Sequence, residues 1–394
     1  MESLKPLQGM KDVFDSRART KRIMLNSLAE FLESCEFEQI DLPLLEETDL
    51  LLKKSGGTLA SKMYSFIDPG GRNISLRPEF TSSVVRAFLN KDIDPSAATK
   101  IFYYGQIFRY SFDNGNNLRE FTQVGCEFIG ALPQTSDKEI LMTAIKGTNL
   151  FLKDCSIRIG HMEIINQILD ELNLSNRLKF FISEHLNILK EGDSGINKLK
   201  EMALKLGLIS DMANGELSAN KDKGELLQSY LTNMGMYNLG VRTIDEIQTR
   251  FLNKGIYSQS VDSFVSTLKN LHQIISFTGD YKEVLNYLSN NCSTKVAETI
   301  KDLSNLIGLI KSAEIKNIEI DLSLGREIPY YTGLVFQITS EYGDEDIIVS
   351  QGGRYDDLIS VLGNNQLSTP ALGFAWNLDA LQMISELGRE YIER

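Results

Sequence analysis

Four short polar stretches carry side chains that could bind a small charged molecule. They are LRPEFT (76–81), FRYSFDNGNNLREFTQVGCEFIG (108–130), LGREIPYYTG (324–333) and QGGRYDDL (351–358). Carboxylates and amides pair with an ammonium group, guanidinium groups hold carboxylates or phosphates, and tyrosine rings wall an aromatic ligand. Taken singly, each stretch more often gives a surface ion pair or a packed ring. Their meaning therefore depends on the elements that position them.

The second stretch indicates a β-hairpin with one functional face. Read at a period of two, Gln123 and Glu127 lie on one side of the second strand, and Val124 and Cys126 lie on the other. Arg109 ends the first strand, before a loop rich in Asn and Gly. The hairpin is thus predicted to aim Arg109, Gln123 and Glu127 at one place.

The elements around these stretches indicate an α+β fold. A helix with apolar residues at Leu25, Leu28 and Leu32 precedes the extended segment FEQIDLPLLE (37–46). From about residue 136 to 312 the pattern is that of long amphipathic helices, and the last eighty residues return to strands. We therefore expect one sheet domain formed by residues 1–160 and 314–394, interrupted by a mainly helical insertion, 161–313.

Composition excludes several classes of protein. The chain has 394 residues, a net charge of −12 and no dense Lys/Arg block, so extensive nucleic-acid binding is not expected. No apolar run is long enough to cross a bilayer and the N-terminus has no signal-peptide core, so a cytoplasmic protein is expected. The four scattered cysteines predict neither a zinc site nor a disulfide framework.

Taken in order, the motifs resemble those of the catalytic domain of class II histidyl-tRNA synthetases. GMKDVF (9–14) resembles the opening turn, FEQIDLPLLE the dimer-forming first motif, and 108–130 the second motif. REIPYYTG and GGRYDDL resemble the two histidine-enzyme signatures, and PALGFAWNL (370–378) resembles the third motif. The resemblance implies a six-stranded antiparallel sheet flanked by helices.

The resemblance also implies a pocket for free histidine. Carboxylate and amide oxygens would meet its polar groups, tyrosines would form walls and hydroxyl contacts, and Arg326 would hold its carboxylate. The histidine-binding residues implied by the matched motifs are Glu79, Thr81, Arg109, Gln123, Glu127, Arg326, Tyr330, Tyr331 and Tyr355.

The half of the site that would use ATP departs from the family pattern. Ser111 stands where the family has a glutamate, FDNGNN (112–117) replaces a basic loop, and Ala380 replaces the arginine that packs on adenine. Pro329 replaces an aspartate of the first histidine signature. The sequence also ends soon after the third motif, so no anticodon-binding domain is expected. No catalytic residue, metal or cofactor is therefore expected.

A synthetase-like chain of this kind resembles the regulatory subunit of ATP phosphoribosyltransferase. That resemblance implies a partner, the short-form catalytic subunit, in a hetero-octamer that contains dimers of this chain. The regulatory subunit would be required for catalytic activity and for feedback inhibition by histidine in the first step of histidine biosynthesis. The alternative is a truncated histidyl-tRNA synthetase-like enzyme that adenylates an amino acid. A third alternative, a module that docks an unrelated partner, leaves the polar pocket unexplained.

Overall fold

The computed structural model describes residues 4–53, 57–91, 98–111, 118–172, 174–210, 259–324, 330–363 and 369–385. Its helices are α1 (Asp15–Ser34), α2 (Thr48–Leu52), α3 (Gly57–Ala60), α4 (Thr81–Asn90), α5 (Pro133–Asn149), α6 (Met162–Glu171), α7 (Asn176–Glu184), α8 (Leu186–Leu189), α9 (Asp193–Lys205), α12 (Val261–Ser276), α13 (Tyr281–Asn291), α14 (Thr294–Ile310), α15 (Leu358–Gly363) and α16 (Leu378–Ile384). Its strands are β1 (Glu38–Gln39), β2 (Leu45–Glu47), β3 (Ser65–Ile67), β4 (Asn73–Leu76), β5 (Thr99–Phe108), β6 (Glu120–Ile129), β7 (Cys155–His161), β8 (Ile209–Ser210), β9 (Gln259–Ser260), β10 (Gly279–Asp280), β11 (Asn317–Ile320), β12 (Leu334–Tyr342), β13 (Glu345–Arg354) and β14 (Ala371–Asn377).

One large sheet organises the fold, with strand order β1-β5-β6-β14-β13-β12-β7-β11-β10. The six strands from β5 to β7 in this order pair antiparallel with their neighbours. The predicted α+β fold is therefore confirmed. At the two edges, β1 and β11 add parallel pairs, so the sheet in the described chain is mixed and wider than the resemblance implied.

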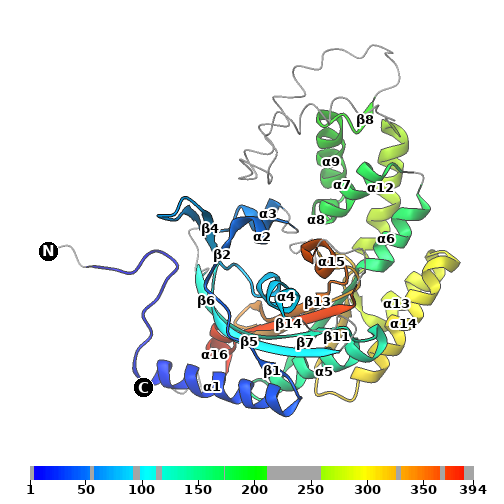
Figure 1. Cartoon of the computed structure of the whole chain (residues 1–394). Helices are drawn as coiled ribbons and strands as arrows, with labels where there is room; N and C mark the ends of the chain where they lie inside the picture. The colour runs from blue at the N-terminus through cyan, green and yellow to red at the C-terminus, as the bar shows by residue number, and fades with distance from the viewer. Residues whose placement is uncertain are drawn as a thin grey trace.

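Helices cover both faces of this sheet (Figure 1). On one face, Val84 and Val85 of α4 and Leu358 of α15 belong to an apolar cluster with strand residues such as Ile101. On the other face, α1, α5 and α16 pack against the alternate strand residues, including Phe102. Because successive strand residues point to opposite faces, β5 serves both clusters.

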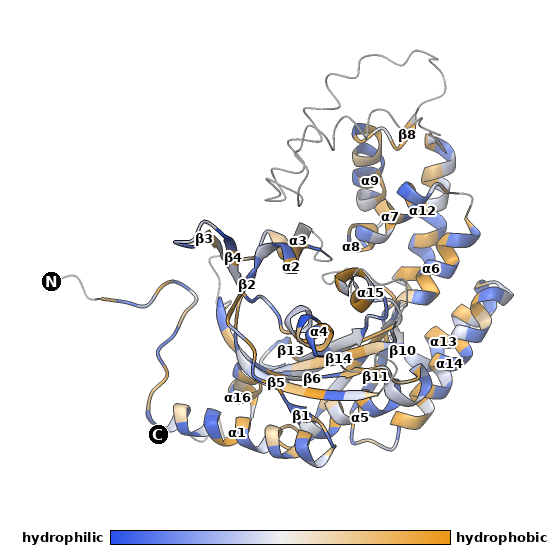
Figure 2. Ribbon diagram, in the orientation of Figure 1, coloured by the Kyte–Doolittle hydropathy of each residue, from blue (hydrophilic) through white to orange (hydrophobic). Residues whose placement is uncertain are grey.

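The first helix shows how sequence pattern becomes packing. Met24, Leu28 and Leu32 recur every four residues, and all three are fully buried against the sheet. Figure 2 shows the result, with hydrophobic colour along the central strands and alternating hydrophobic and hydrophilic sides along α1. The predicted helix at this position is confirmed.

Helices α6 to α9 and α12 to α14 lie between β7 and β11 in the sequence, and most of them stand at one end of the sheet (Figure 1). Several begin at a side chain that accepts a backbone N–H, including Ser175, Ser260, Asp280 and Ser293. Helix α14 packs against α5 and α6, which ties this helical region to the sheet. The predicted bounds of the insertion, 161–313, stay a prediction. No described helix has both the length and the apolar character needed to cross a bilayer.

Candidate functional site

A pocket lies on the α4 face of the sheet, above the middle of β6 and β14. Its floor is shaped by glycine at the position paired with Glu127, because Gly373 is the register partner of that residue. A Cβ atom at Gly373 would lie 1.7 Å from Glu127 Oε2, so only glycine leaves room for this carboxylate. The glycine of GFAWN thus permits the Glu127 side chain from β6 to occupy the floor.

The pocket brings together most of the residues predicted from the motifs. The described residues among the predicted set that line it are Glu79, Thr81, Arg109, Gln123, Glu127, Tyr330, Tyr331 and Tyr355. They come from four separate parts of the chain, which is the convergence that the single motifs could not establish. Arg326, the ninth predicted residue, lies outside the described residues, as do Pro329 and the loop 112–117.

Glu127 is the central polar group of the pocket. It is 1% exposed, and its carboxylate accepts hydrogen bonds from Thr81 Oγ1 at 2.8 Å, Tyr103 OH at 3.1 Å and Tyr355 OH at 2.6 Å. Burial raises the pKa of Glu127 to about 7, and the hydroxyl donors of Tyr355 and Thr81 oppose the rise. The carboxyl group is thus poised to change charge near neutral pH.

Glu79 forms a second buried carboxylate at the start of α4. Its two oxygens accept the backbone N–H of Ser82, at 3.1 and 3.2 Å, in the first turn of the helix. Burial raises the pKa of Glu79, while the hydrogen bonds from Ser82 and the charge of Arg109 lower it. The helix therefore fixes Glu79 beside the pocket and leaves its carboxylate facing the same space as Glu127.

Aromatic rings enclose these carboxylates. The ring centroid of Tyr330 lies 5.4 Å from that of Tyr331 and 6.0 Å from that of Tyr355, and both pairs meet edge to face. Burial raises the pKa of Tyr330 and of Tyr355 well above the ordinary value, so both hydroxyls stay protonated donors. The cavity they leave is about 30 Å³, room for one or two water molecules. A bound amino acid must therefore displace side chains, and Tyr331 is less buried than Tyr330 and Tyr355.

Arg109 is the cationic side chain that lines the pocket in the described part of the chain. Its Nε donates to the carbonyl of Pro78 at 2.8 Å, and its charge acts on the Glu79 carboxylate. The walls thus present two carboxylates and one guanidinium. This balance favours a ligand that carries at least one positive charge together with a carboxylate.

Six lining residues were not among those predicted from the motifs, namely Phe80, Tyr103, Gln351, Gly373, Phe374 and Ala375. Tyr103 was predictable in principle, because the hairpin pairs it with Gly125 on the strand that carries Glu127. Phe80 stacks on Tyr103 with ring centroids 4.3 Å apart. Gln351 is the first residue of the QGGRYDDL stretch.

Ser111 and Ala380, the two departures that lie in the described part of the chain, carry no charged side chain themselves. The carbonyl of Ser111 accepts Arg119 Nη2 at 2.9 Å, and the Arg119 guanidinium lies 4.2 Å from the Tyr110 ring centroid. Ala380 is 8% exposed, packs in the apolar cluster, and donates its N–H to Asn377 Oδ1 as part of the α16 cap. Its methyl group cannot stack on an adenine as an arginine does.

The buried Glu127 carboxyl predicts a pH dependence of stability. Its pKa is raised from 4.5 to about 7 in the folded chain, so the folded state holds a proton that the unfolded state releases between these values. The unfolding free energy should therefore fall as pH rises through this window, by roughly 3 kcal/mol from this group. Urea titrations of wild type and Glu127→Gln over that range should diverge by this amount. Parallel pH curves would contradict the assignment.

Comparison with known proteins shows which family the chain resembles over most of its length. A family model described as histidyl-tRNA synthetase matches residues 9–228 and 245–381. The histidine–tRNA ligase of Methanococcus aeolicus is 28% identical over 378 residues, which span 95% of this chain and 75% of that protein. That of Methanocaldococcus jannaschii is 27% identical over 376 residues, spanning 95% and 74%.

Solved structures share the fold at lower sequence identity. One from Bacillus halodurans, called an ATP phosphoribosyltransferase regulatory subunit/histidyl-tRNA synthetase, has a TM-score of 0.63 at 18% identity and covers 96% of this chain and 82% of its own. The apo histidyl-tRNA synthetase of S. aureus has a TM-score of 0.56 at 20% identity, covering 97% and 73%. At these identities the likeness establishes the fold alone.

Proposed function

Because the chain belongs to the histidyl-tRNA synthetase family, we propose that its pocket binds free histidine as a regulatory signal rather than as a substrate. The protein would serve as the regulatory subunit of ATP phosphoribosyltransferase. It would be required for the activity of a short catalytic subunit and would confer feedback inhibition by histidine.

The observation that carries the proposal is the contrast between the two halves of the site. Glu79, Gln123 and Glu127 converge in one buried pocket with three tyrosines, while the position of the adenine-packing arginine holds the buried methyl group of Ala380. Adenylation needs cations fixed around a phosphorus centre that gains charge, whereas binding histidine does not. The groups suited to recognition are present, and a group needed for activation is absent from the described third motif.

Histidine matches the charges and the aromatic side chains that line the pocket. Its ammonium group would pair with Glu79 and the Gln123 amide oxygen, and an imidazole N–H would donate to the Glu127 carboxylate. The rings of Tyr330 and Tyr355 would enclose the imidazole. The role of Arg109, beside Glu79, would be to meet the ligand carboxylate together with Arg326.

Regulation would follow from linkage between histidine and the assembly. If histidine binds one arrangement of the complex better than another, it shifts the equilibrium by that difference in binding free energy and no more. No cofactor is needed for this role.

Self-association as a dimer within a hetero-octamer is part of the proposal. The first-motif segment contributes Leu42 and Leu44 to a groove of about 770 Å³ that also borders α1 and β5. Nearby on the small sheet β2-β4-β3, Leu45, Phe66 and Ile67 are exposed apolar side chains. Exposed apolar surface of this kind is suited to a protein interface.

Co-expression with a short-form ATP phosphoribosyltransferase catalytic subunit tests the assembly. We expect the two chains to co-purify, with a mass by light scattering that fits a hetero-octamer, because an isolated short subunit lacks its regulator. Phosphoribosyl transfer should depend on this chain and should fall when histidine is added. Failure of both association and stimulation would contradict the proposal.

A second candidate function is an enzyme that adenylates histidine or another amino acid. Arg109 favours it, since this guanidinium lines the pocket at the position of the second-motif arginine. The similarity to histidine–tRNA ligases over 95% of the chain also favours it. Histidine-dependent exchange of pyrophosphate into ATP separates the two functions.

A further inference from the structure

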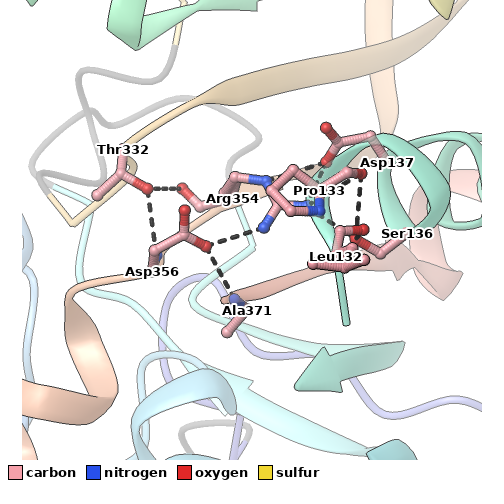
Figure 3. Close-up of polar contacts among 8 residues, drawn as sticks. All are labelled: Leu132, Pro133, Ser136, Asp137, Thr332, Arg354, Asp356 and Ala371. Atoms are coloured by element: carbon pink, nitrogen blue, oxygen red, sulfur yellow. Dashed lines mark hydrogen bonds and ion pairs between the residues drawn. The ribbon is translucent and has the colours of Figure 1, made fainter. Parts of the chain in front are cut away.

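A buried cluster of charged and polar groups joins three parts of the chain behind the pocket. It consists of Ser136, Asp137, Thr332, Arg354 and Asp356, with the backbone of Ala371 (Figure 3). None of these residues lines the cavity. Arg354, at the end of β13, is 4% exposed and lies at the centre of the cluster.

The Arg354 guanidinium is held from two directions. Its Nε and Nη2 donate to Asp137 Oδ1 at 3.1 and 2.6 Å, and Nη2 donates to Ser136 Oγ at 2.8 Å. On the other side, Nη1 donates to Asp356 Oδ1 at 2.9 Å. A planar guanidinium with five donors in fixed directions suits such a bridge, and an ammonium group does not.

Each partner of Arg354 is directly connected to an element that carries pocket residues. Ser136 and Asp137 lie near the start of α5, which follows β6 and its Glu127. Asp356 Oδ1 also accepts the N–H of Ala371 at 2.9 Å, where β14 begins. The cluster therefore links the β6–α5 junction, the end of β13 and the start of β14.

The same cluster fixes the tyrosine walls. Tyr355, between Arg354 and Asp356, donates its N–H to the Ala371 carbonyl at 2.7 Å and its hydroxyl to Glu127 Oε2 at 2.6 Å. Thr332, directly after Tyr331, donates its N–H to the Arg354 carbonyl at 2.7 Å, and its Oγ1 accepts the Asp356 N–H at 3.1 Å. The backbone beside Tyr331 and Tyr355 is thus bonded to residues 354–356, and the Arg354 guanidinium holds this segment through the Asp356 carboxylate.

We propose that Arg354 is a positioning residue for the ligand pocket, which sets the placement of Tyr355 and of the Tyr330–Tyr331 segment against Glu127. This inference rests on the proposed function, because its test uses the affinity of the pocket for histidine. A buried ion pair is weak evidence for stability, since its desolvation cost offsets much of its attraction. Specifying the geometry of a site is a role that such a network can serve.

The test compares Arg354→Lys with an arginine, Arg86, that also pairs with a carboxylate but does not line the cavity. Arg354→Lys keeps the positive charge but removes the planar guanidinium with its fixed N–H donors. The control is Arg86→Lys. In the native chain Arg86 donates to the buried Glu46 carboxylate through Nε at 3.0 Å and Nη2 at 2.7 Å. Neither Arg86 nor Glu46 lines the cavity. Two quantities are measured in the full-length chain. Histidine affinity is measured by calorimetric titration, and the pKa of Glu127 is measured from infrared difference spectra that compare each protein with its Glu127→Gln form.

We expect Arg354→Lys to weaken histidine binding by about tenfold or more, since a hydrogen bond to a charged group contributes roughly that factor. The pKa of Glu127 should rise further, because the Tyr355 hydroxyl bond that lowers it is disturbed. Arg86→Lys should change neither quantity by more than about twofold. A milder variant, Thr332→Val, which removes the acceptor of the Asp356 N–H, should act in the same direction and serves if Arg354→Lys does not fold.

The two proposals fail in different ways. If wild type does not bind histidine but the pKa of Glu127 responds to Arg354→Lys or Thr332→Val, the histidine function is overturned and the positioning role is supported. If wild type binds histidine and the folded variants change neither its affinity nor the Glu127 pKa, the positioning role is overturned. Equal effects of the Arg86 control would also overturn it, because they would indicate general destabilisation.

Discussion

Histidine-dependent exchange of pyrophosphate into ATP should be at least about 10⁴-fold slower for this protein than for a histidyl-tRNA synthetase assayed beside it. Removing one preorganised charge contact typically lowers a rate by about 10²- to 10³-fold. Here two positions of the ATP half, Ser111 and Ala380, lack the family's charged groups. The effects of residues in one site do not add reliably, so this estimate takes the lower bound of each.

Residues next to the position of the missing arginine are already engaged in other contacts. Ala380 is buried in the apolar cluster, and its helix start is capped by Asn377. The adjacent Asp379 is already engaged, since its carboxylate accepts Lys21 Nζ and the Thr122 N–H, both at 2.7 Å. The nearby Lys21 charge is thus committed to an ion pair and is not directed at a phosphate.

Arg109→Ala is the control that shows whether any exchange signal depends on the pocket. If wild type shows robust exchange and Arg109→Ala abolishes it, the chain is an adenylating enzyme and the regulatory proposal is wrong. If the signal survives this substitution, exchange does not depend on the cation that lines the pocket in the described chain. Background rates in both proteins are the expected outcome.

The hairpin was the part of the site that sequence could predict best. Alternation in 120–129 places Gln123 and Glu127 on one face, and the structure puts both in the pocket with Val124 and Cys126 in the opposite core. This succeeded because the strand period is two and both faces are covered, which leaves little freedom of register.

Long-range ion pairs could not be predicted in the same way. Arg354 and Asp137 are 217 residues apart, and nothing in either local pattern points to the other. Arg77, in the stretch LRPEFT, has the residue type of a ligand-binding group but is buried and donates to the carbonyls of Leu42 and Gln106. Residue type and motif position therefore locate a site, while tertiary contacts decide which polar groups face the ligand.

Glu127→Ala should weaken histidine inhibition of the assembled phosphoribosyltransferase by about 100-fold while leaving the assembly intact. The Glu127 carboxylate is the acceptor at the pocket floor, and losing a hydrogen bond to a charged group costs about 1.5–3 kcal/mol. Assembly should persist, because Glu127 is 1% exposed and offers no surface to a partner chain. Light scattering of the mixed complex checks the second point, and inhibition curves check the first.

A graded series separates ligand recognition from general damage. Tyr355→Phe keeps the ring and removes the hydroxyl that donates to Glu127 at 2.6 Å, so it should weaken inhibition less than Glu127→Ala. Isothermal titration should show losses of histidine affinity in the same order as the losses of inhibition. If Glu127→Ala abolished inhibition while histidine affinity stayed unchanged, the effector would bind elsewhere, in a site built jointly with the catalytic subunit. The pocket would then transmit the signal without receiving it, since a ligand shifts an equilibrium only through differential binding.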